Sequence, residues 1–205
     1  MAIKALNPFQ LALLRPSERR RIWEESLKEA SAFEDEDLVV IPKESITVEE
    51  ECPTATDFKE FLKWLETQSV DRHIRYIFLH CTATRPNAKV SSIINYWKNN
   101  LGWKNYGYNA VLSENSYTVL ADLQQVCNGV RGYNSSSVHI SYIGGIDANN
   151  RPFDTRTPYQ KAMMIRMTKA LRKKFPNAKV MLHNEVSTKA CPSFSREVLE
   201  GELYN

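Results

Sequence analysis

Cysteine, histidine and glycine are scarce in this chain of 205 residues, which holds four, four and seven of them. The four cysteines lie far apart, so they do not form the dense pattern of a disulfide-stapled secreted domain. Reduced thiols or a metal site are the better interpretation. The sequence also lacks an apolar run of the ~20 residues that a membrane-spanning helix needs. We therefore predict no membrane segment.

The amino-terminal segment lacks the features of a secretory signal. Its apolar patch, residues 5–14, is interrupted by Asn7, Pro8 and Gln10, and no small-residue cleavage site follows. We therefore expect a protein that is synthesised in the cytoplasm.

The net charge of +3 conceals an asymmetry. Residues 1–70 hold 9 Lys and Arg against 15 Asp and Glu, whereas residues 71–205 hold 18 against 9. A basic carboxyl-terminal part suits an anionic polymer such as a cell wall or a nucleic acid. Ordinary solubilising charge is the alternative.

The acidic first part reads as an extension rather than a domain. Residues 15–32 have helical character, with Ser17 as a candidate N-cap. Residues 39–42 favour a short strand or an extended arm, and an acidic linker follows. We predict an extension over residues 1–55 and one folded domain over residues 56–205.

From residue 56 onward, helical and strand patterns alternate. Apolar residues spaced i, i+3, i+4 and i+7 predict a helix over residues 58–65. Short apolar runs predict strands at residues 76–79, 108–112, 117–120, 138–143 and 180–182. This alternation predicts an α/β fold with a mixed sheet covered by helices.

Two further helices have clear boundaries. Residues 89–101 end before Gly102, a typical helix stop, and their buried face is predicted to carry Ile93, Ile94, Trp97 and Leu101. The next helix begins with Thr157 as N-cap, Pro158 at the first position and Gln160 completing a capping box. It should run to about Phe175.

Three residues stand where metal chemistry is expected. His80 sits at the end of one predicted strand, His183 sits at the end of another, and Cys191 comes eight positions later. Two imidazoles and a thiolate suit zinc, and three protein ligands leave a fourth position for water or substrate. On residue types alone, a histidine after a strand is more often an ordinary satisfied polar residue than a metal ligand.

The surrounding segments carry more information. His80 lies in IFLHCTAT, residues 77–84, and the other two candidates lie in HNEV and KACPSF, residues 183–186 and 189–194. Between them stand Gly102-Trp103, Gly107-Tyr108, RGYN (131–134) and SYIGGID (141–147). These elements resemble, in order and spacing, the motifs of the type 2 N-acetylmuramoyl-L-alanine amidases. The resemblance covers residues 75–199 and is strongest to bacteriophage lysozyme-type amidases, with peptidoglycan recognition proteins as distant relatives.

The resemblance implies an amidase and peptidoglycan-recognition-protein-like fold with one zinc ion bound by His80, His183 and Cys191. It also implies that Tyr108 and Lys189 assist catalysis. The implied reaction is hydrolysis of the amide between the lactyl group of N-acetylmuramic acid and L-alanine of the stem peptide. Bacterial peptidoglycan is then the partner, and we expect no nucleic-acid ligand and a monomer.

The chemistry of the two assisting residues agrees with these implied roles. A tetrahedral intermediate carries an oxyanion, to which Lys189 can offer a positive charge and Tyr108 a hydrogen bond. Either side chain can also serve a proton transfer. Without the motifs, Tyr108 would be read as a core aromatic and Lys189 as a solvated loop lysine.

Two positions depart from the family pattern. Asn109 stands where many relatives have histidine, and Gly129 stands near a histidine that lines the substrate cleft of some phage relatives. Neither is a metal ligand, so we expect differences in substrate fit or pH response rather than in zinc binding.

The remaining histidines and cysteines match no ligand motif. We expect His73 at the surface, whereas His139 lies in a predicted strand and is a candidate for substrate contact. Strand alternation turns Cys81 away from His80, so we read it as a small buried hydrophobe. Cys52 and Cys127 have no assigned role.

Several functions remain open from the sequence. A phage or prophage endolysin, released to the cell wall by a separate membrane lesion, is the leading hypothesis. A delivered antibacterial effector would have a similar sequence. A non-catalytic peptidoglycan-binding module typically loses the cysteine ligand, whereas Cys191 is present here. A phage regulatory protein that binds another protein through residues 1–55 is a further alternative. Nothing in the sequence of these residues identifies such a partner.

Overall fold

A computed structural model of the chain describes residues 55–204. The predicted helix at residues 15–32, the predicted strand at residues 39–42 and Cys52 lie outside the described part. Within it, no helix is long and apolar enough to cross a membrane.

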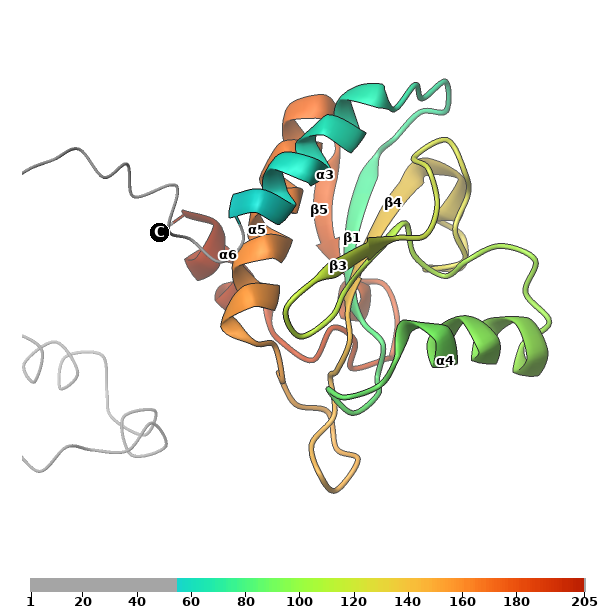
Figure 1. The fold of residues 1–205 in the computed structure, drawn as a ribbon, viewed down its shortest axis with the longest axis vertical. Helices are drawn as coiled ribbons and strands as arrows, with labels where there is room; N and C mark the ends of the chain where they lie inside the picture. Colours follow the sequence, from blue (N-terminus) through green and yellow to red (C-terminus); the bar gives the residue numbers. More distant parts are fainter. Residues whose placement is uncertain (1–54, 205) are drawn as a thin grey trace, which may run out of the picture. The chain divides into compact units, whose positions relative to one another are not determined.

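A five-stranded mixed sheet forms the centre of the domain, with strand order β3-β2-β4-β1-β5 (Figure 1). The β2, β4, β1 and β5 strands run parallel, and β3 pairs antiparallel with β2. The predicted α/β fold with a mixed sheet is confirmed. The strands are β1 (Tyr76–Cys81), β2 (Ala110–Leu112), β3 (Tyr117–Val119), β4 (Ser137–Tyr142) and β5 (Lys179–Leu182).

Helices cover both faces of the sheet (Figure 1). The larger core cluster joins one face to residues of α3, α5 and α6, and the smaller joins the other face to α4 and η1. Two 3₁₀ turns, η2 and η3, adjoin strands. The helical elements are α3 (Ala55–Thr67), α4 (Val90–Asn95), η1 (Tyr96–Asn100), η2 (Asn134–Ser136), α5 (Pro158–Lys174), η3 (His183–Glu185) and α6 (Arg196–Tyr204).

Strand alternation in β1 divides its side chains between the two faces. Ile77, Leu79 and Cys81 belong to the larger core cluster with α5. Phe78 and His80 point to the opposite face, where Phe78 stacks on another imidazole of the sheet. Cys81 is buried and turned away from His80 as predicted, but it is not purely apolar, because its Sγ lies 3.6 Å from the Ser193 hydroxyl oxygen.

The start of α5 has the predicted capping box. The Gln160 backbone N–H donates to the Thr157 hydroxyl (3.2 Å), and the Thr157 N–H donates to the Gln160 side-chain carbonyl (2.9 Å). Pro158 occupies the first helical position, and the helix ends one residue before Phe175. Because these contacts are local, the sequence pattern was sufficient to predict them.

The helix predicted over residues 89–101 is present, but its second half is a π-helix. Ile93 and Trp97 are buried as predicted, Ile94 is half-buried, and Leu101 is 42% exposed. The prediction for Leu101 was wrong because the i→i+5 bond from its N–H to the Tyr96 carbonyl changes the helical phase.

Two strand boundaries also differ from the predictions. The apolar run predicted over residues 76–79 is extended in β1 by His80 and Cys81. The predicted strand from Tyr108 begins only at Ala110, because the Asn109 side chain is bonded to loop carbonyls and to the backbone of β4.

Candidate metal centre

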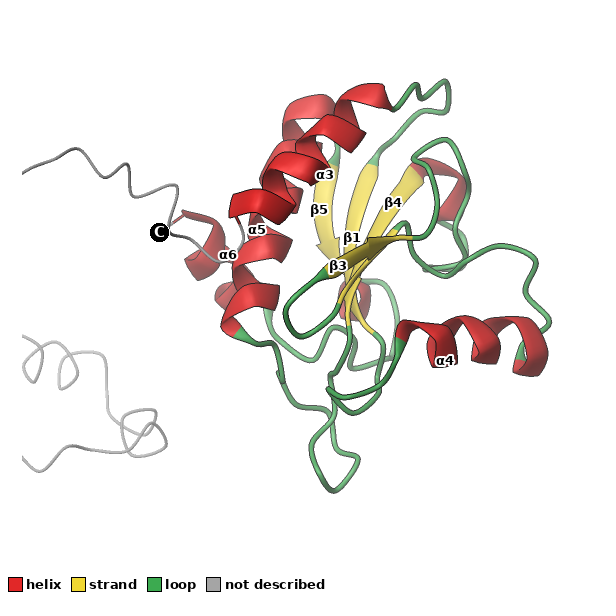
Figure 2. Cartoon of the chain, viewed as in Figure 1, coloured by secondary structure: helices red, strands yellow, loops and turns green. Residues whose placement is uncertain are grey.

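The candidate ligands gather at one edge of the sheet. Parallel strands β1 and β5 are neighbours, so their carboxyl ends meet at the same edge. His80 is the fifth residue of β1, and His183 opens the 3₁₀ turn directly after β5. Figure 2 shows the loops that follow these strands leaving the sheet together. Cys191 lies in the loop after β5.

The structure brings the three predicted ligand side chains into contact. His80 Nδ1 lies 3.2 Å from His183 Nδ1 and 3.6 Å from Cys191 Sγ. The three candidate ligand atoms all lie within 4.8 Å of one another. Tetrahedral ligands at ordinary zinc distances would place two nitrogens about 3.3 Å apart and a nitrogen and a sulfur about 3.6 Å apart. The two distances from His80 Nδ1 therefore match those expected of a tetrahedral zinc site, and the third pair of donor atoms lies within 4.8 Å.

Burial keeps both imidazoles of this set neutral. Burial lowers the pKa of His80 well below its ordinary value, with further lowering by neighbouring histidines and Lys189. Burial and the Lys189 charge lower the pKa of His183 to about 4. A hydrogen bond with Cys81, together with burial, raises the pKa of the Cys191 thiol. A metal ion would therefore bind two imidazoles that are already neutral, and its binding would release the proton of the Cys191 thiol.

Tyr108 packs beside the candidate ligands from the segment before β2. Its ring centroid lies 5.0 Å from that of His80 and 5.2 Å from that of Trp97. Its hydroxyl donates to the Cys81 carbonyl (3.3 Å). Burial raises the pKa of Tyr108, so the hydroxyl stays protonated and can act as a donor.

Lys189 lies in the same loop as Cys191 and is exposed. Its positive charge contributes to lowering the pKa values of both His183 and His80. The side chain thus adds a positive potential at the centre while remaining open to solvent.

Comparison with known proteins gives the family. The family model described as N-acetylmuramoyl-L-alanine amidase matches residues 70–194, which include every candidate site residue. This chain belongs to the N-acetylmuramoyl-L-alanine amidase family. It is thus an amidase, and it is 40% identical over 131 residues to the endolysin of Enterobacteria phage K11, an alignment that covers 62% of this chain and 86% of the phage protein.

Solved structures agree with the amidase fold. The Ph2119 endolysin from a Thermus scotoductus bacteriophage has a TM-score of 0.56 at 21% identity, over 70% of this chain and 96% of that protein. Bumblebee PGRP-SA has a TM-score of 0.50 at 18% identity, over 61% of this chain and 80% of that protein. These likenesses confirm the expected amidase and recognition-protein-like architecture.

The turn that carries His183 is fixed by an ion pair. Glu185 accepts a hydrogen bond from the Leu182 N–H (2.7 Å) at the end of β5. Arg196, at the start of α6, pairs with the same carboxylate at 2.5 Å. The amidase therefore ties the end of β5 to α6 next to His183.

The loop around Cys191 is bonded to the carboxyl ends of β1 and β4. The Cys81 N–H donates to Cys191 Sγ (3.2 Å), and the Tyr142 hydroxyl donates to the Pro192 carbonyl (2.8 Å). Ser193 donates to the Gly145 carbonyl (2.8 Å). Gly145 has φ +100°, and a Cβ there would lie 2.4 Å from Cys81 Sγ, so only glycine fits this contact.

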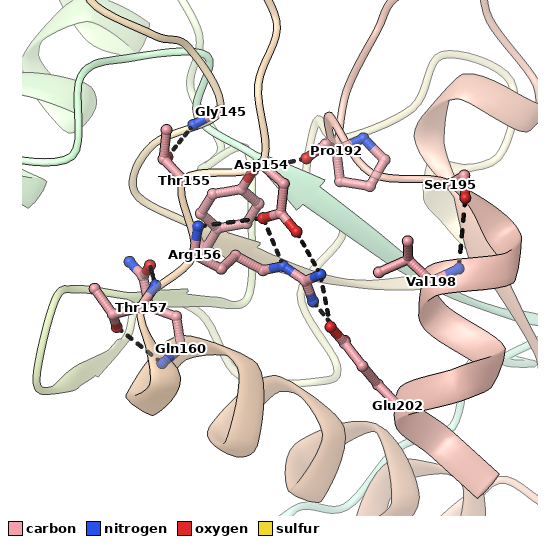
Figure 3. Close-up of polar contacts among 11 residues, drawn as sticks. Gly145, Asp154, Thr155, Arg156, Thr157, Gln160, Pro192, Ser195, Val198 and Glu202 are labelled. Atoms are coloured by element: carbon pink, nitrogen blue, oxygen red, sulfur yellow. Dashed lines mark hydrogen bonds and ion pairs between the residues drawn. The ribbon is translucent and has the colours of Figure 1, made fainter. Parts of the chain in front are cut away.

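A buried ion-pair network supports the same loop (Figure 3). The Arg156 side chain is completely buried and pairs with Asp154 and Glu202, each at 2.8 Å. Its guanidinium carbon lies 3.6 Å from the ring centroid of Phe194, three residues after Cys191. The network links the loop before α5, the cysteine loop and α6. Sequence analysis missed Arg156 because two of its partners, Glu202 and Phe194, are distant in the sequence.

Sequence analysis also missed the role of His139 in the fold. His139 is fully buried, and its Nδ1 lies 3.1 Å from His80 Nε2. It was predicted as a candidate for substrate contact, but the structure buries it completely against His80. The sequence did place His139 in a predicted strand. Which residue of β1 it faces depends on the register of β4 against β1, and this register cannot be read from the sequence.

The two positions that depart from the family pattern have structural roles here. Asn109 is buried and bonds to the backbone of β4, accepting from the His139 N–H (2.9 Å). Gly129 has no side chain to line a cleft, and the His139 ring lies against it. Of the residues that match no ligand motif, His73 is exposed as predicted, and Cys127 is buried.

Proposed function

We propose that this amidase is a phage endolysin that hydrolyses the bond between the lactyl group of N-acetylmuramic acid and L-alanine in bacterial peptidoglycan. We further propose that it is zinc-dependent, with His80, His183 and Cys191 as the ligands. The family assignment and the phage relative support the reaction. The spacing of the three donor atoms is the observation that carries the metal assignment.

Each proposed catalytic side chain has a distinct task. Bound zinc supplies Lewis acidity and lowers the pKa of a water molecule towards about 7. The Tyr108 hydroxyl stays protonated and would turn from the Cys81 carbonyl to donate its hydrogen bond to the oxyanion that develops on the scissile carbonyl. The Lys189 charge stabilises the same oxygen from the exposed side of the centre. His80 and His183 stay neutral and hold the metal.

One experiment tests the reaction. Purified protein is incubated with peptidoglycan, with and without a chelator, and the digest is analysed by mass spectrometry. We expect intact glycan strands and stem peptides with a new L-alanine amino terminus, and no release after chelation. New reducing sugar ends without free peptides would indicate a glycosidase and contradict the proposal. Binding without any cleavage would indicate a recognition module instead.

Elemental analysis tests the ligands. The wild type should hold about one zinc per chain, whereas His183→Ala and Cys191→Ala should lose most of it. Cys127→Ala is the matched control, because this cysteine is also buried but is not part of the ligand cluster. Undiminished zinc in both ligand variants would refute the assignment.

A further inference from the structure

The two ring nitrogens of His80 face different partners. Nδ1 lies 3.2 Å from His183 Nδ1 and 3.6 Å from Cys191 Sγ, so it faces the proposed metal. Nε2 lies 3.1 Å from Nδ1 of His139 on the neighbouring strand β4. The remote nitrogen of a ligating histidine usually donates its proton to a fixed acceptor, which sets the tautomer and orientation of the ring.

We propose that His139 is a positioning residue for His80: its Nδ1 accepts the Nε2–H of His80 and holds the tautomer in which His80 Nδ1 is free to bind the metal. This inference rests on the proposed metal site. It assigns His139 a role in metal affinity rather than in contact with substrate.

The tautomers of the two rings follow from one another. A metal-binding Nδ1 carries no proton, so the proton of His80 is on Nε2 and must be donated. His139 Nδ1 must then be a bare acceptor, and His139 carries its own proton on Nε2. That Nε2 is buried, and none of the described residues offers it a hydrogen-bond partner.

The unpartnered nitrogen argues against a role in packing alone. A buried N–H without a partner destabilises the fold, and an aliphatic side chain of similar size would avoid this. What the imidazole at position 139 adds is the acceptor for His80. The cost of leaving His139 Nε2–H without a partner is therefore offset by the orientation of His80.

The ring of His139 is held so that it cannot turn away. It stacks on Phe78, with centroids 5.8 Å apart and planes at 13°. On another side lies Gly129, where an added Cβ would be 2.4 Å from His139 Nδ1 and 2.6 Å from Cγ. The backbone of His139 is also fixed, because it exchanges two 2.9 Å hydrogen bonds with Asn109.

Zinc affinity of two substitutions at position 139 tests the assignment. His139→Leu removes the acceptor, whereas His139→Asn keeps an acceptor oxygen near the position of Nδ1. Competition with a chelator of known affinity should give about 10–100-fold weaker zinc binding for His139→Leu. His139→Asn should recover most of that loss. Thermal melting of the metal-free proteins serves as the control, and we expect no loss of stability in His139→Leu.

The space beside Gly129 offers a second, independent test. Gly129→Ala should displace the His139 ring and weaken zinc binding. The same substitution in a His139→Ala background should have little further effect, because the ring that it displaces is absent. Equal effects of Gly129→Ala in both backgrounds would contradict the assignment.

Nitrogen-15 NMR of the zinc-loaded wild type tests the tautomers without any substitution. The chain has only four histidines, so their ring nitrogens can be assigned. We expect protons on Nε2 of both His80 and His139. A proton on His139 Nδ1 would overturn the role proposed for His139 but leave the proposed metal site standing. Zinc affinity of a folded His139→Leu within about twofold of wild type would have the same consequence. A wild type that binds no zinc would overturn the proposed metal site as well.

Discussion

Tyr108 and Lys189 offer two different kinds of stabilisation at the same centre. Tyr108 is held by its ring contacts with His80 and Trp97, and its hydroxyl is aimed at the end of β1. Lys189 is exposed in the loop before Cys191 and acts through its charge. Because neither supplies a donor atom to the ligand cluster, their contributions can be separated from metal binding.

We predict that Tyr108→Phe and Lys189→Ala lower kcat while zinc content stays unchanged. Losing one oxyanion donor typically costs about 10²–10³ in rate, and a somewhat smaller loss is expected for Tyr108→Phe. The two effects need not add, because both side chains act on one intermediate. Peptide release from peptidoglycan and elemental analysis provide the measurements.

Matched controls exist for both substitutions. Tyr106→Phe removes a hydroxyl from a nearby half-buried ring, and Lys169→Ala removes an exposed charge on α5. Both controls should retain activity. Wild-type turnover in Tyr108→Phe and Lys189→Ala alike would mean that other groups stabilise the intermediate.

At the scale of elements, the cysteine loop depends on contacts from both sides. Its residues bond to the ends of β1 and β4 and rest on the buried guanidinium of Arg156. That guanidinium also connects the loop before α5 to α6. A substitution that breaks this ion-pair network should therefore change both the stability of the fold and the position of Cys191.

We predict that Arg156→Ala destabilises the fold by about 3–5 kcal/mol, because it leaves two partly buried carboxylates without a partner. Arg151→Ala is the control: its pair with Asp147 is at the surface, so its loss should destabilise the fold far less. Urea unfolding of the two variants measures the difference. Similar losses for both would show that the buried network contributes little.

At the scale of the whole molecule, the sheet buries histidines that stay neutral. Burial lowers the pKa of His139 to about 3 and, with the Lys189 charge, that of His183 to about 4. The pKa of His80 is also lowered well below 6.5. The unfolded chain takes up protons on these groups near pH 6.5, whereas the folded chain does not.

We predict that the metal-free protein is most stable above pH 6.5 and loses stability as the pH falls through the range from 6.5 to about 4. Each buried histidine should contribute about 1.4 kcal/mol per pH unit in that range. Urea unfolding in chelator at a series of pH values measures the slope. His139→Leu should reduce it, and His73→Gln should not, because His73 is exposed. A flat profile would contradict the prediction.

We also predict that a chain beginning at Ala55 folds and binds zinc, because the described core and all candidate ligands lie after that point. A chain beginning at Asp71 lacks α3 and is the control. It should be unstable, because Phe61 and Leu65 are then missing from the core and Asp57 from its bond with Tyr159. Loss of zinc or solubility in the longer chain would place residues 1–54 within the folded unit.

The sequence by itself determined the features that depend on short segments. The capping box before α5 joins residues three apart, and the apolar spacing of α3 repeats along one helix. The three proposed ligands stand in short motifs that resemble those of a known family, so they could be proposed without coordinates. The prediction that Leu101 is buried was wrong because no local sequence pattern indicates the change to a π-helix.

Only the tertiary structure decided how distant segments serve the centre. His139 meets His80 across 59 positions because β4 pairs with β1 in one register, and a shift of one residue would turn its ring to the other face. Arg156 pairs with Glu202, which is 46 positions away in the sequence, because α6 packs beside it. Short family-like motifs therefore pointed to the proposed ligands, whereas strand register and helix packing selected the side chains that hold them in place.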